Sequence, residues 1–292
     1  MSIEEIICTQ YSQTFEDNFK NDMVIGRLAA QKYADNLLYG DEANVVMPGR
    51  VAMNDWDGGD LEYPEKITSS IVKIKVNKGK QVNFELERDK EIQMEQDLSN
   101  GQFTLVDEYI SDARYQFRDA VDAALGALYP FAGYVLDDGG SDIILTPDNA
   151  FDVLSFMKAK FARGNNGSAW VNNKMAAIFP PEAIAVMLGM SYLQYTESQV
   201  KDKATGFVTE KAGWRIYESN NIVSPAANSY RPLFGIEGGS LACVIQKDMA
   251  LVPYMRDESL NKAFKGGAVY GVSAPRADKF GTAKISITLN LS

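Results

Sequence analysis

Residues 104–128 read TLVDEYISDARYQFRDAVDAALGAL, the clearest helical pattern in the chain. Apolar side chains recur there at intervals of three and four residues, from Val106 to Leu128, which places them on one helix face. Thr104 suits the N-cap position, and the acidic residues after it favour the positive end of the helix dipole. At 1.5 Å per residue the helix would be about 36 Å long, and it would end before Pro130. A helix of this length can brace a whole subunit.

The composition fits an ordinary globular protein and excludes several kinds of catalysis. The 292 residues are 46% hydrophobic and 23% charged, and 39 acids against 29 bases give a net charge of −10. The sequence contains no histidine, so Ser-His-Asp and Cys-His nucleophile systems and imidazole metal sites are impossible. Catalysis would have to use carboxylates, lysine, tyrosine or a bound cofactor.

Other bulk features predict an intracellular protein without targeting or membrane segments. Cys8 and Cys243 form no disulfide framework, and we expect two reduced thiols, with Cys243 in a core strand. No base precedes Lys20, so a signal peptide is not expected. The apolar stretch 175–190 contains two prolines and is too short to span a membrane. The acid excess disfavours tight binding of nucleic acid.

Residues 44–88 have the pattern of long strands. Strands are predicted at 44–53, 67–76 and 82–86, with a turn-forming cluster at 54–60. Alternation on either side of residues 77–80 predicts a hairpin in which Ile74 lies opposite Phe84. That register would place Lys73 opposite Glu85, a favourable pair across the strands.

The remaining patterns alternate between helix and strand. Helices are predicted at 148–163, 181–195 and 258–264, and strands at 175–179, 214–222, 240–246, 268–273 and 284–291. Residues 21–39 show a loose helical spacing and too few apolar side chains for a core, so they are expected to pack on another part of the molecule. Helices mixed with antiparallel hairpins predict the α+β class.

Motifs for catalysis or cofactor binding are weak. Asp137, Asp138 and Asp142 flank two glycines and could pair carboxylates for acid–base work, but any exposed turn has this composition. The acidic cluster at 55–60 resembles the start of a calcium loop, yet Asp60 and Lys66 occupy its glycine and glutamate positions. No glycine-rich nucleotide loop follows a strand. The chain is therefore expected to be no enzyme and to need no cofactor or metal.

Six stretches follow one another in an order that matches a known family. They are WDGGDLEY at 56–63, NFEL at 83–86 with its continuation to residue 97, the helix at 107–128, MAAIFPPEA at 175–183, WRIYESNN at 214–221 and FKGGAVYG at 264–271. The sequence resembles the major capsid (coat) proteins of tailed bacteriophages, whose Hong Kong phage-type fold is shared with encapsulin shells. The stretches are similar, in turn, to the extended-loop tip, the strand returning from it, the spine helix, two parts of the axial domain and the return strand.

The resemblance implies a division of the chain into five parts. They are an N-terminal arm at 1–43, an extended β-hairpin loop at 44–80, a peripheral domain with the spine helix at 81–130, an axial domain at 131–267 and return strands of the peripheral domain at 268–292. It also implies self-assembly into the pentamers and hexamers of an icosahedral head that encloses double-stranded DNA. Such a subunit would be assembled in the host cytoplasm and located in the virion.

The resemblance further implies partners. Some members carry a large N-terminal scaffold segment, whereas only about forty residues precede the first predicted strand here. We therefore expect a separate scaffolding protein, or assembly without one, together with a portal, weak non-specific contact with packaged DNA and no membrane. Cross-linking between subunits is not expected, because residues 55–63 contain no lysine.

Contacts between subunits are expected at the loop and along its strands. The expected residues are Trp56, Asp57, Gly58, Gly59, Asp60, Tyr63, Lys73, Lys75, Glu85 and Glu87. Trp56 at a glycine-rich tip would anchor an interface, unless it folds back on its own subunit. Polar strand edges are available to a neighbouring copy.

Two alternatives to a phage head remain open at this stage. An encapsulin-type compartment shell has the same fold and packages an enzyme instead of a genome. A carboxylate-dependent enzyme, from a different class, would rest only on the turn at 137–142.

Overall fold

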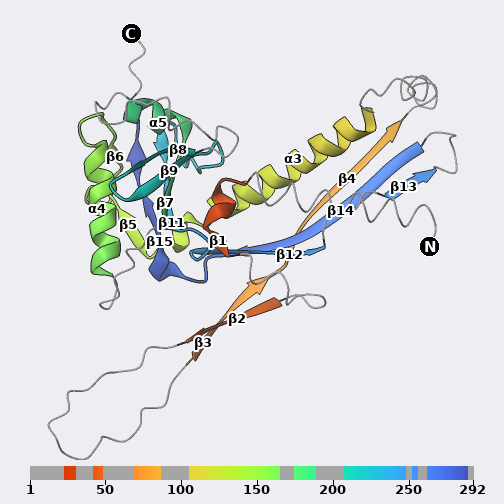
Figure 1. The fold of residues 1–292 in the computed structure, drawn as a ribbon, viewed down its shortest axis with the longest axis horizontal. Coiled ribbons are helices and arrows are strands. Elements are labelled where there is room, and N and C mark those ends of the chain that lie inside the picture. The colour runs from red at the N-terminus through yellow and green to blue at the C-terminus, as the bar shows by residue number, and fades with distance from the viewer. Residues whose placement is uncertain are drawn as a thin grey trace, which may run out of the picture.

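Two β-sheets meet near the middle of the molecule, one in a rounded lobe and the other in a long blade (Figure 1). The computed structural model describes residues 23–30, 42–48, 69–86, 105–164, 174–188, 207–247, 252–255 and 262–288. This mixture of helices with parallel and antiparallel strand pairs confirms the α+β class.

The lobe is built on a six-stranded sheet. Its strands, in spatial order, are β5 (Tyr134–Leu136), β15 (Phe280–Ala283), β11 (Leu233–Ile236), β7 (Met175–Phe179), β9 (Trp214–Glu218) and β8 (Phe207–Lys211). The pairs β5–β15 and β7–β9 are parallel and the others antiparallel. Every residue of β7 is buried because both faces of the sheet are covered. A smaller sheet contains β10 (Ser229–Tyr230), β16 (Ile285–Ser286) and β6 (Ile143–Ile144). Each of its strands is adjacent in sequence to a strand of the six-stranded sheet.

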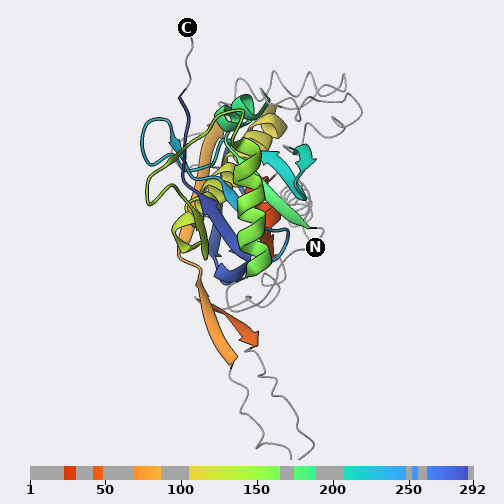
Figure 2. The same cartoon turned by 90° about the vertical axis from the view of Figure 1, so that its left-hand side faces the viewer.

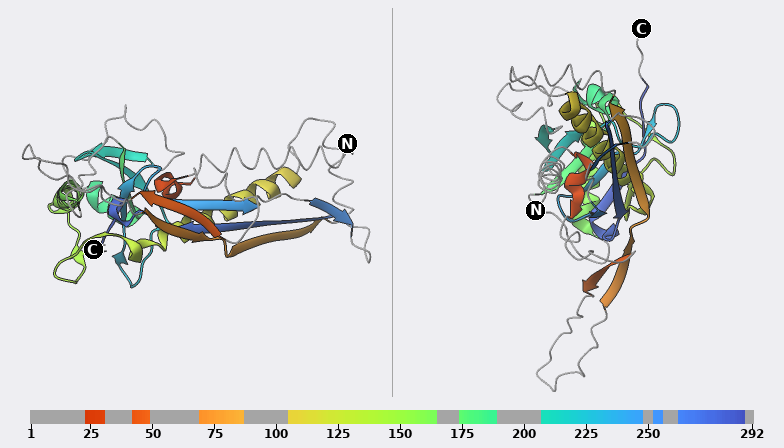
Figure 3. Two further views of the ribbon diagram at one scale, coloured as in Figure 1. Left: turned by 90° about the horizontal axis from the view of Figure 1, so that it is seen from below. Right: turned by 90° about the vertical axis from the view of Figure 1, so that its right-hand side faces the viewer.

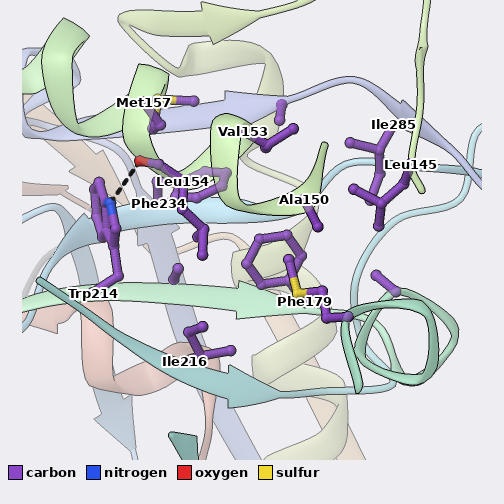
Figure 4. Close-up of a cluster of buried hydrophobic side chains, with 14 of the residues drawn as sticks. Leu145, Ala150, Val153, Leu154, Met157, Phe179, Trp214, Ile216, Phe234 and Ile285 are labelled. Atoms are coloured by element: carbon purple, nitrogen blue, oxygen red, sulfur yellow. Dashed lines mark hydrogen bonds between the residues drawn. The ribbon is translucent and has the colours of Figure 1, made fainter. Parts of the chain in front are cut away.

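Helix α4 (Ala150–Arg163) covers one face of the lobe sheet. Its buried side chains recur at helical spacing, and Leu154, Met157 and Phe161 belong to the cluster that contains Trp214 of β9. The Trp214 indole N–H donates a 3.1 Å hydrogen bond to the Leu154 carbonyl (Figure 4). The helix ends at Gly164, whose φ of 63° is a conformation that favours glycine. The helix predicted at 148–163 is thus confirmed within two residues.

Helix α5 (Pro181–Leu188) follows β7 as predicted, with proline in its first turn. Its predicted continuation to residue 195 lies outside the described residues. The predicted strand at 214–222 ends earlier, at Glu218. Of the strand predicted at 284–291, only the two residues of β16 form a strand among the residues described, and β15, which precedes it, was not predicted.

The blade combines the second sheet with the long helix α3 (Leu105–Gly126). Strand β14 (Lys262–Ser273) is its axis, with β12 (Leu241–Lys247) and β13 (Val252–Met255) on one edge and β4 (Lys78–Leu86) on the other. Figure 3 shows β4 and β14 running side by side along the blade. The expected spine helix is confirmed, and its Phe117 meets the ring of Tyr270 on β14 edge-on at 5.7 Å.

The predicted pairing of the strands before and after residues 77–80 is wrong. Strand β3 (Ser69–Lys75) pairs with β2 (Glu42–Pro48), whereas β4 pairs along its whole length with β14. The alternation correctly indicated that Ile74 and Phe84 point inward. The two side chains do not face each other, however, because their strands pair with different strands. Ile74 packs with residues of β12, and the ring of Phe84 stacks on Phe264 of β14 at 5.1 Å.

A second correction concerns the short helix predicted at 258–264. Residues 262–264 belong to β14, and 256–261 lie outside the described residues. At this end β14 has strands on both edges, so its backbone groups are paired in the sheet and the local helical spacing is overridden.

The segment Met23–Ala30 is not a regular helix, and it packs into the hydrophobic core. It forms one 3-10 turn, η1 (Ile25–Leu28), and a two-residue strand, β1 (Ala29–Ala30), which runs parallel to β12. The loose helix predicted over 21–39 is therefore wrong at β1. The expectation that this region packs on another part of the molecule is confirmed for the described residues, because Ile25 and Leu28 are fully buried.

Two further expectations can be compared with the described part of the chain. Cys243 is buried in β12, as predicted, whereas Cys8 lies outside it. None of the helices described is both long and apolar enough to cross a lipid bilayer.

Candidate assembly surfaces

The hairpin of β2 and β3 projects away from both the lobe and the blade (Figures 1 and 2). Its base is anchored in the molecule, since Ala43, Ile74 and Val76 are buried in a small cluster with side chains of β12. Further along β3, Ile71 leaves 59% of its surface exposed. The hairpin is thus a rigidly rooted element whose outer part offers apolar surface to a partner.

Charged side chains on this hairpin pair within it. Lys73 Nζ lies 2.8 Å from a carboxylate oxygen of Glu42, and Lys75 Nζ lies 3.9 Å from the other. The hydrogen bond from Lys73 lowers the pKa of Glu42 and raises that of Lys73 itself. Because both lysines are exposed and Glu42 is partly exposed, water screens these ion pairs, and they orient the hairpin surface more than they stabilise it.

The residues predicted for contact between subunits are only partly brought together. Lys73 and Lys75 lie on the projecting hairpin, but their acidic partner is Glu42 and not Glu85, which lies opposite Ala263 in the blade. The other predicted contact residues lie outside the described part of the chain: Trp56, Asp57, Gly58, Gly59, Asp60, Tyr63 and Glu87.

Sequence reasoning missed exposed apolar side chains on and next to α4. Phe156 is 61% exposed, and Phe151 and Ile144 also face solvent. Asn149, which precedes α4, holds Ile144 next to the helix, because its side-chain amide donates to the Ile144 carbonyl. The sequence held a signal for Phe156 alone, since it falls outside the apolar stripe of this helix, whereas Phe151 is at helical spacing from Leu154. Figure 2, viewed toward the lobe, shows α4 at the front of the molecule.

The acidic turn at 137–142 has a structural role that accounts for two of its three carboxylates. Asp137 binds Lys284 Nζ at 3.0 Å, and that hydrogen bond lowers its pKa. Asp142 lies 3.1 Å from the Arg231 guanidinium and accepts a hydrogen bond from Ser229. These pairs tie the turn to neighbouring strands, and a lowered pKa is the opposite of what a general acid requires. Among the described residues, no group of three or more acidic or thiol side chains is arranged to hold a metal.

Comparison with known proteins gives matches only at the level of structure. No family model and no curated protein matches the sequence. A solved structure from Mycobacterium phage Che8 has a TM-score of 0.67 and 16% identity, covering 89% of this chain and 90% of that one. A capsid structure of cyanophage P-SCSP1u gives 0.61 and 13%, covering 86% and 85%.

A third match is a virus-like particle from Pyrococcus furiosus. It has a TM-score of 0.55 and 12% identity, and covers 94% of this chain and 98% of that one. Identities this low establish the fold alone. The chain has the Hong Kong phage-type capsid fold, as the resemblance implied.

Proposed function

We propose that this chain is a major capsid protein, a structural subunit that assembles with copies of itself into the pentamers and hexamers of an icosahedral phage head around double-stranded DNA. The observation that carries the proposal is the likeness to a phage capsid structure over 86% of this chain and 85% of that one. A match of such extent on both sides leaves little of the chain for a separate activity, so the subunit is proposed to be no enzyme.

Exposed apolar side chains support assembly on physical grounds. Ile71 on the projecting hairpin and Phe156 on α4 each leave more than half of their surface in water. Contiguous apolar patches on a monomer mark places where another protein binds, and we propose that these side chains belong to such patches. These two regions lie far apart on the molecule, as Figure 1 shows, so a subunit could contact different neighbours through each.

The finer organisation is part of the same proposal. The five-part division of the chain, with an extended loop at 44–80 and an axial domain at 131–267, is carried over from the family resemblance. Its boundary after residue 267 falls inside β14, which shares a sheet with β12 and β13. The loop tip, including Trp56 and Tyr63, is proposed to lie on a neighbouring subunit, together with Lys73 and Lys75 on the hairpin and Glu85 and Glu87 on the following strand. A scaffolding protein, a portal and weakly bound DNA are proposed as partners. Assembly would take place in the host cytoplasm and leave the subunit in the virion.

The test is the size of the purified protein. Sedimentation velocity and negative-stain microscopy, on the chain alone and co-expressed with its neighbouring gene products, should show rings or megadalton shells. A monodisperse monomer under all of these conditions would contradict the proposal.

Two matched variants address the hairpin. Ile71→Ser should leave the circular dichroism spectrum unchanged but reduce shell formation, because it removes apolar surface from the outer hairpin. Ile71→Val keeps the apolar surface and should assemble as the wild type does.

A deletion tests the loop tip. Removal of residues 54–62 should give a folded subunit that no longer assembles, and shells of normal yield from that deletion would show that the loop tip is no interface.

A compartment shell is the second candidate, because the Pyrococcus furiosus virus-like particle is matched over 98% of its chain. The contents of the shell separate the two candidates. Nuclease-protected DNA inside purified particles favours the phage head, whereas a packaged protein without nucleic acid favours the compartment.

A further inference from the structure

The segment Met23–Ala30 crosses the place where the lobe meets the blade. Strand β11 of the lobe sheet continues through residues 237–240 into β12 of the blade sheet, and the segment lies along this connection (Figure 1). We call Met23–Ala30 the strap. Its two fully buried side chains, Ile25 and Leu28, belong to the cluster in which residues of α3 meet residues of the lobe sheet.

On the blade side, the strap is bonded to the spine helix and to β12. The Asp122 carboxylate of α3 accepts hydrogen bonds from the backbone N–H groups of Ile25, at 3.2 Å, and Gly26, at 3.0 Å. Asp122 is only 4% exposed, so its carboxylate depends on these amides and on the side chain of Asn221 for hydrogen bonds in place of water. Ala29 and Ala30 then pair with the first two residues of β12.

On the lobe side, the strap is bonded through Arg27 and Leu28. The Arg27 carbonyl accepts a 2.7 Å hydrogen bond from Gly238 N–H, and the Leu28 carbonyl accepts one of 3.1 Å from Ser240 N–H. The Arg27 guanidinium lies 4.9 Å from the centre of the Tyr217 ring on β9, a cation–π contact.

The Tyr217 ring, which contacts Arg27, is held in position by its own neighbours in the lobe. The Tyr217 hydroxyl donates to Glu237 at 2.8 Å, and Arg215 binds the same carboxylate at 3.1 Å. Leu28 packs directly on the lobe sheet, where a Cβ on Gly235 of β11 would come within 3.3 Å of its Cδ2 atom.

We propose that the strap fixes the angle between the lobe and the blade, and that the Asp122 carboxylate is the latch that holds it in place. Two adjacent backbone amides of the strap donate to this one carboxylate, and a buried amide without an acceptor is costly, so we expect the strap to leave or stay as a unit. With the strap released, only the direct contacts between α3 and the lobe, including the hydrogen bond from Asn221 to Asp119, would hold the angle, and rotation about the connections at 127–133, 237–240 and 274–279 should increase. The inference concerns the single subunit and holds whether or not the chain forms a shell.

The test measures the angle and the attachment separately. Spin labels at Tyr115→Cys on α3 and Ala159→Cys on α4, in a Cys8→Ser background, report the distribution of lobe–blade distances by pulsed electron resonance. Both labelled positions are exposed, and the remaining thiol, Cys243, is buried and does not react. Hydrogen exchange of the peptide that covers the strap reports its attachment.

Asp122→Ala should broaden the distance distribution and increase exchange in the strap at least tenfold. Asp112→Asn is the matched control, since Asp112 is exposed on the same helix and binds only Gln116 among the hydrogen bonds of the described residues. It should change neither measurement. Arg27→Ala is the second variant, because it removes the lobe contact without leaving a buried charge, and it should also broaden the distribution.

Two outcomes would overturn the proposal. Faster exchange in the strap with an unchanged distance distribution would show that the strap only covers the junction. An unchanged exchange rate in Asp122→Ala, or in Arg27→Ala if the first variant does not fold, would show that this contact does not hold it.

Discussion

At Gly281, strand β15 passes so close to α4 that there is no space for a side chain. A Cβ at this position would lie 2.9 Å from a ring carbon of Phe161 and 3.2 Å from the sulfur of Met157, both in the lobe core. The Gly281→Ala variant should therefore overpack the core and lower the free energy of unfolding by about 1–3 kcal/mol. The midpoint of urea unfolding, followed by circular dichroism, gives this difference.

Gly239→Ala is the matched control for that measurement. The nearest atom to its Cβ would be a methyl carbon of Ile236 at 3.9 Å, an ordinary contact. The control should unfold within about 0.5 kcal/mol of the wild type. Equal midpoints for the two alanine variants would mean that α4 can shift away from the sheet without cost.

Asp122 makes the attachment of the strap depend on pH. Burial raises its pKa from 3.8 to about 6, an effect that the strap amides and Asn221 oppose and the charge of Asp119 reinforces. Since the attached state has the higher pKa, it binds the proton more tightly. The resulting stabilisation of the attached strap is complete below pH 3.8 and is lost as the pH rises through 6. Between pH 5 and pH 7 the opening constant of the strap should rise about tenfold.

Two ionisable groups near Asp122, Cys243 and Tyr270, have pKa values raised above their ordinary ranges, so neither changes charge between pH 5 and pH 7. Cys243 faces it from β12, and burial together with the Asp122 charge raises the pKa of that thiol to about 12. Behind Cys243, Tyr270 of β14 also has a raised pKa, and Arg27 of η1 lies over the Tyr217 ring. Hydrogen exchange of Ile25 and Gly26, corrected for the intrinsic rate at each pH, measures the opening. Asp122→Asn should abolish the slope, and a slope that survives in this variant would assign it to another group.

At the scale of elements, the sequence predicted helices better than strand partners. The helix over 104–128 could be located because its apolar stripe persists for six turns, and α4 and α5 have comparable stripes and a glycine or proline at an end. Alternation in 67–76 and 82–86 correctly separated the less exposed side chains from the more exposed ones among the residues described. It carries no information on which strand lies alongside, and the partners of β3 and β4 are distant in the chain.

The same contrast between local pattern and distant partners applies to the exposed surface residues and to the strap. Exposed Phe156 could have been found, because it breaks the stripe of a helix that was predicted correctly, whereas Phe151 lies at helical spacing from buried Leu154 and fits that stripe. The pairing of Lys73 with Glu42 could not, because it depends on the register of β2 against β3. The strap was also beyond prediction, since eight residues have too little pattern to reveal that Asp122, 96 positions further along, binds Gly26.

Engineered disulfides test the strand pairing. Asn44 and Lys73 lie directly opposite each other on β2 and β3, within the range of Cα separations that a disulfide accepts. In a Cys8→Ser background, the pair Asn44→Cys with Lys73→Cys should therefore oxidise readily in the subunit. The pair Lys73→Cys with Glu85→Cys, which the hairpin predicted from alternation alone would join, should stay reduced. Thiol titration and peptide mapping distinguish the two, and efficient closure of the second pair would contradict the observed topology.

At the scale of the whole molecule, the net charge and the exposed apolar side chains act in opposite directions. Each copy carries a charge of −10, so copies that approach one another repel. Contacts such as those proposed for Ile71 and Phe156 must overcome that repulsion by removing apolar surface from water. Assembly then resembles the folding of a small core, in which an attraction at short range is balanced against charge repulsion at longer range.

This balance predicts how assembly responds to salt. Raising the ionic strength from about 0.01 M to 0.15 M shortens the screening length from about 30 Å to 8 Å, which weakens the repulsion and leaves apolar contacts intact. The protein concentration at which shells form, followed by light scattering, should therefore fall as salt is added. Phe156→Ser should need more protein at every salt concentration but show the same slope, because it changes the attraction and not the charge. If added salt instead dissolves the shells, ion pairs between subunits such as those available to Lys73 and Lys75 dominate the contacts, and the apolar surfaces do not hold the shell together.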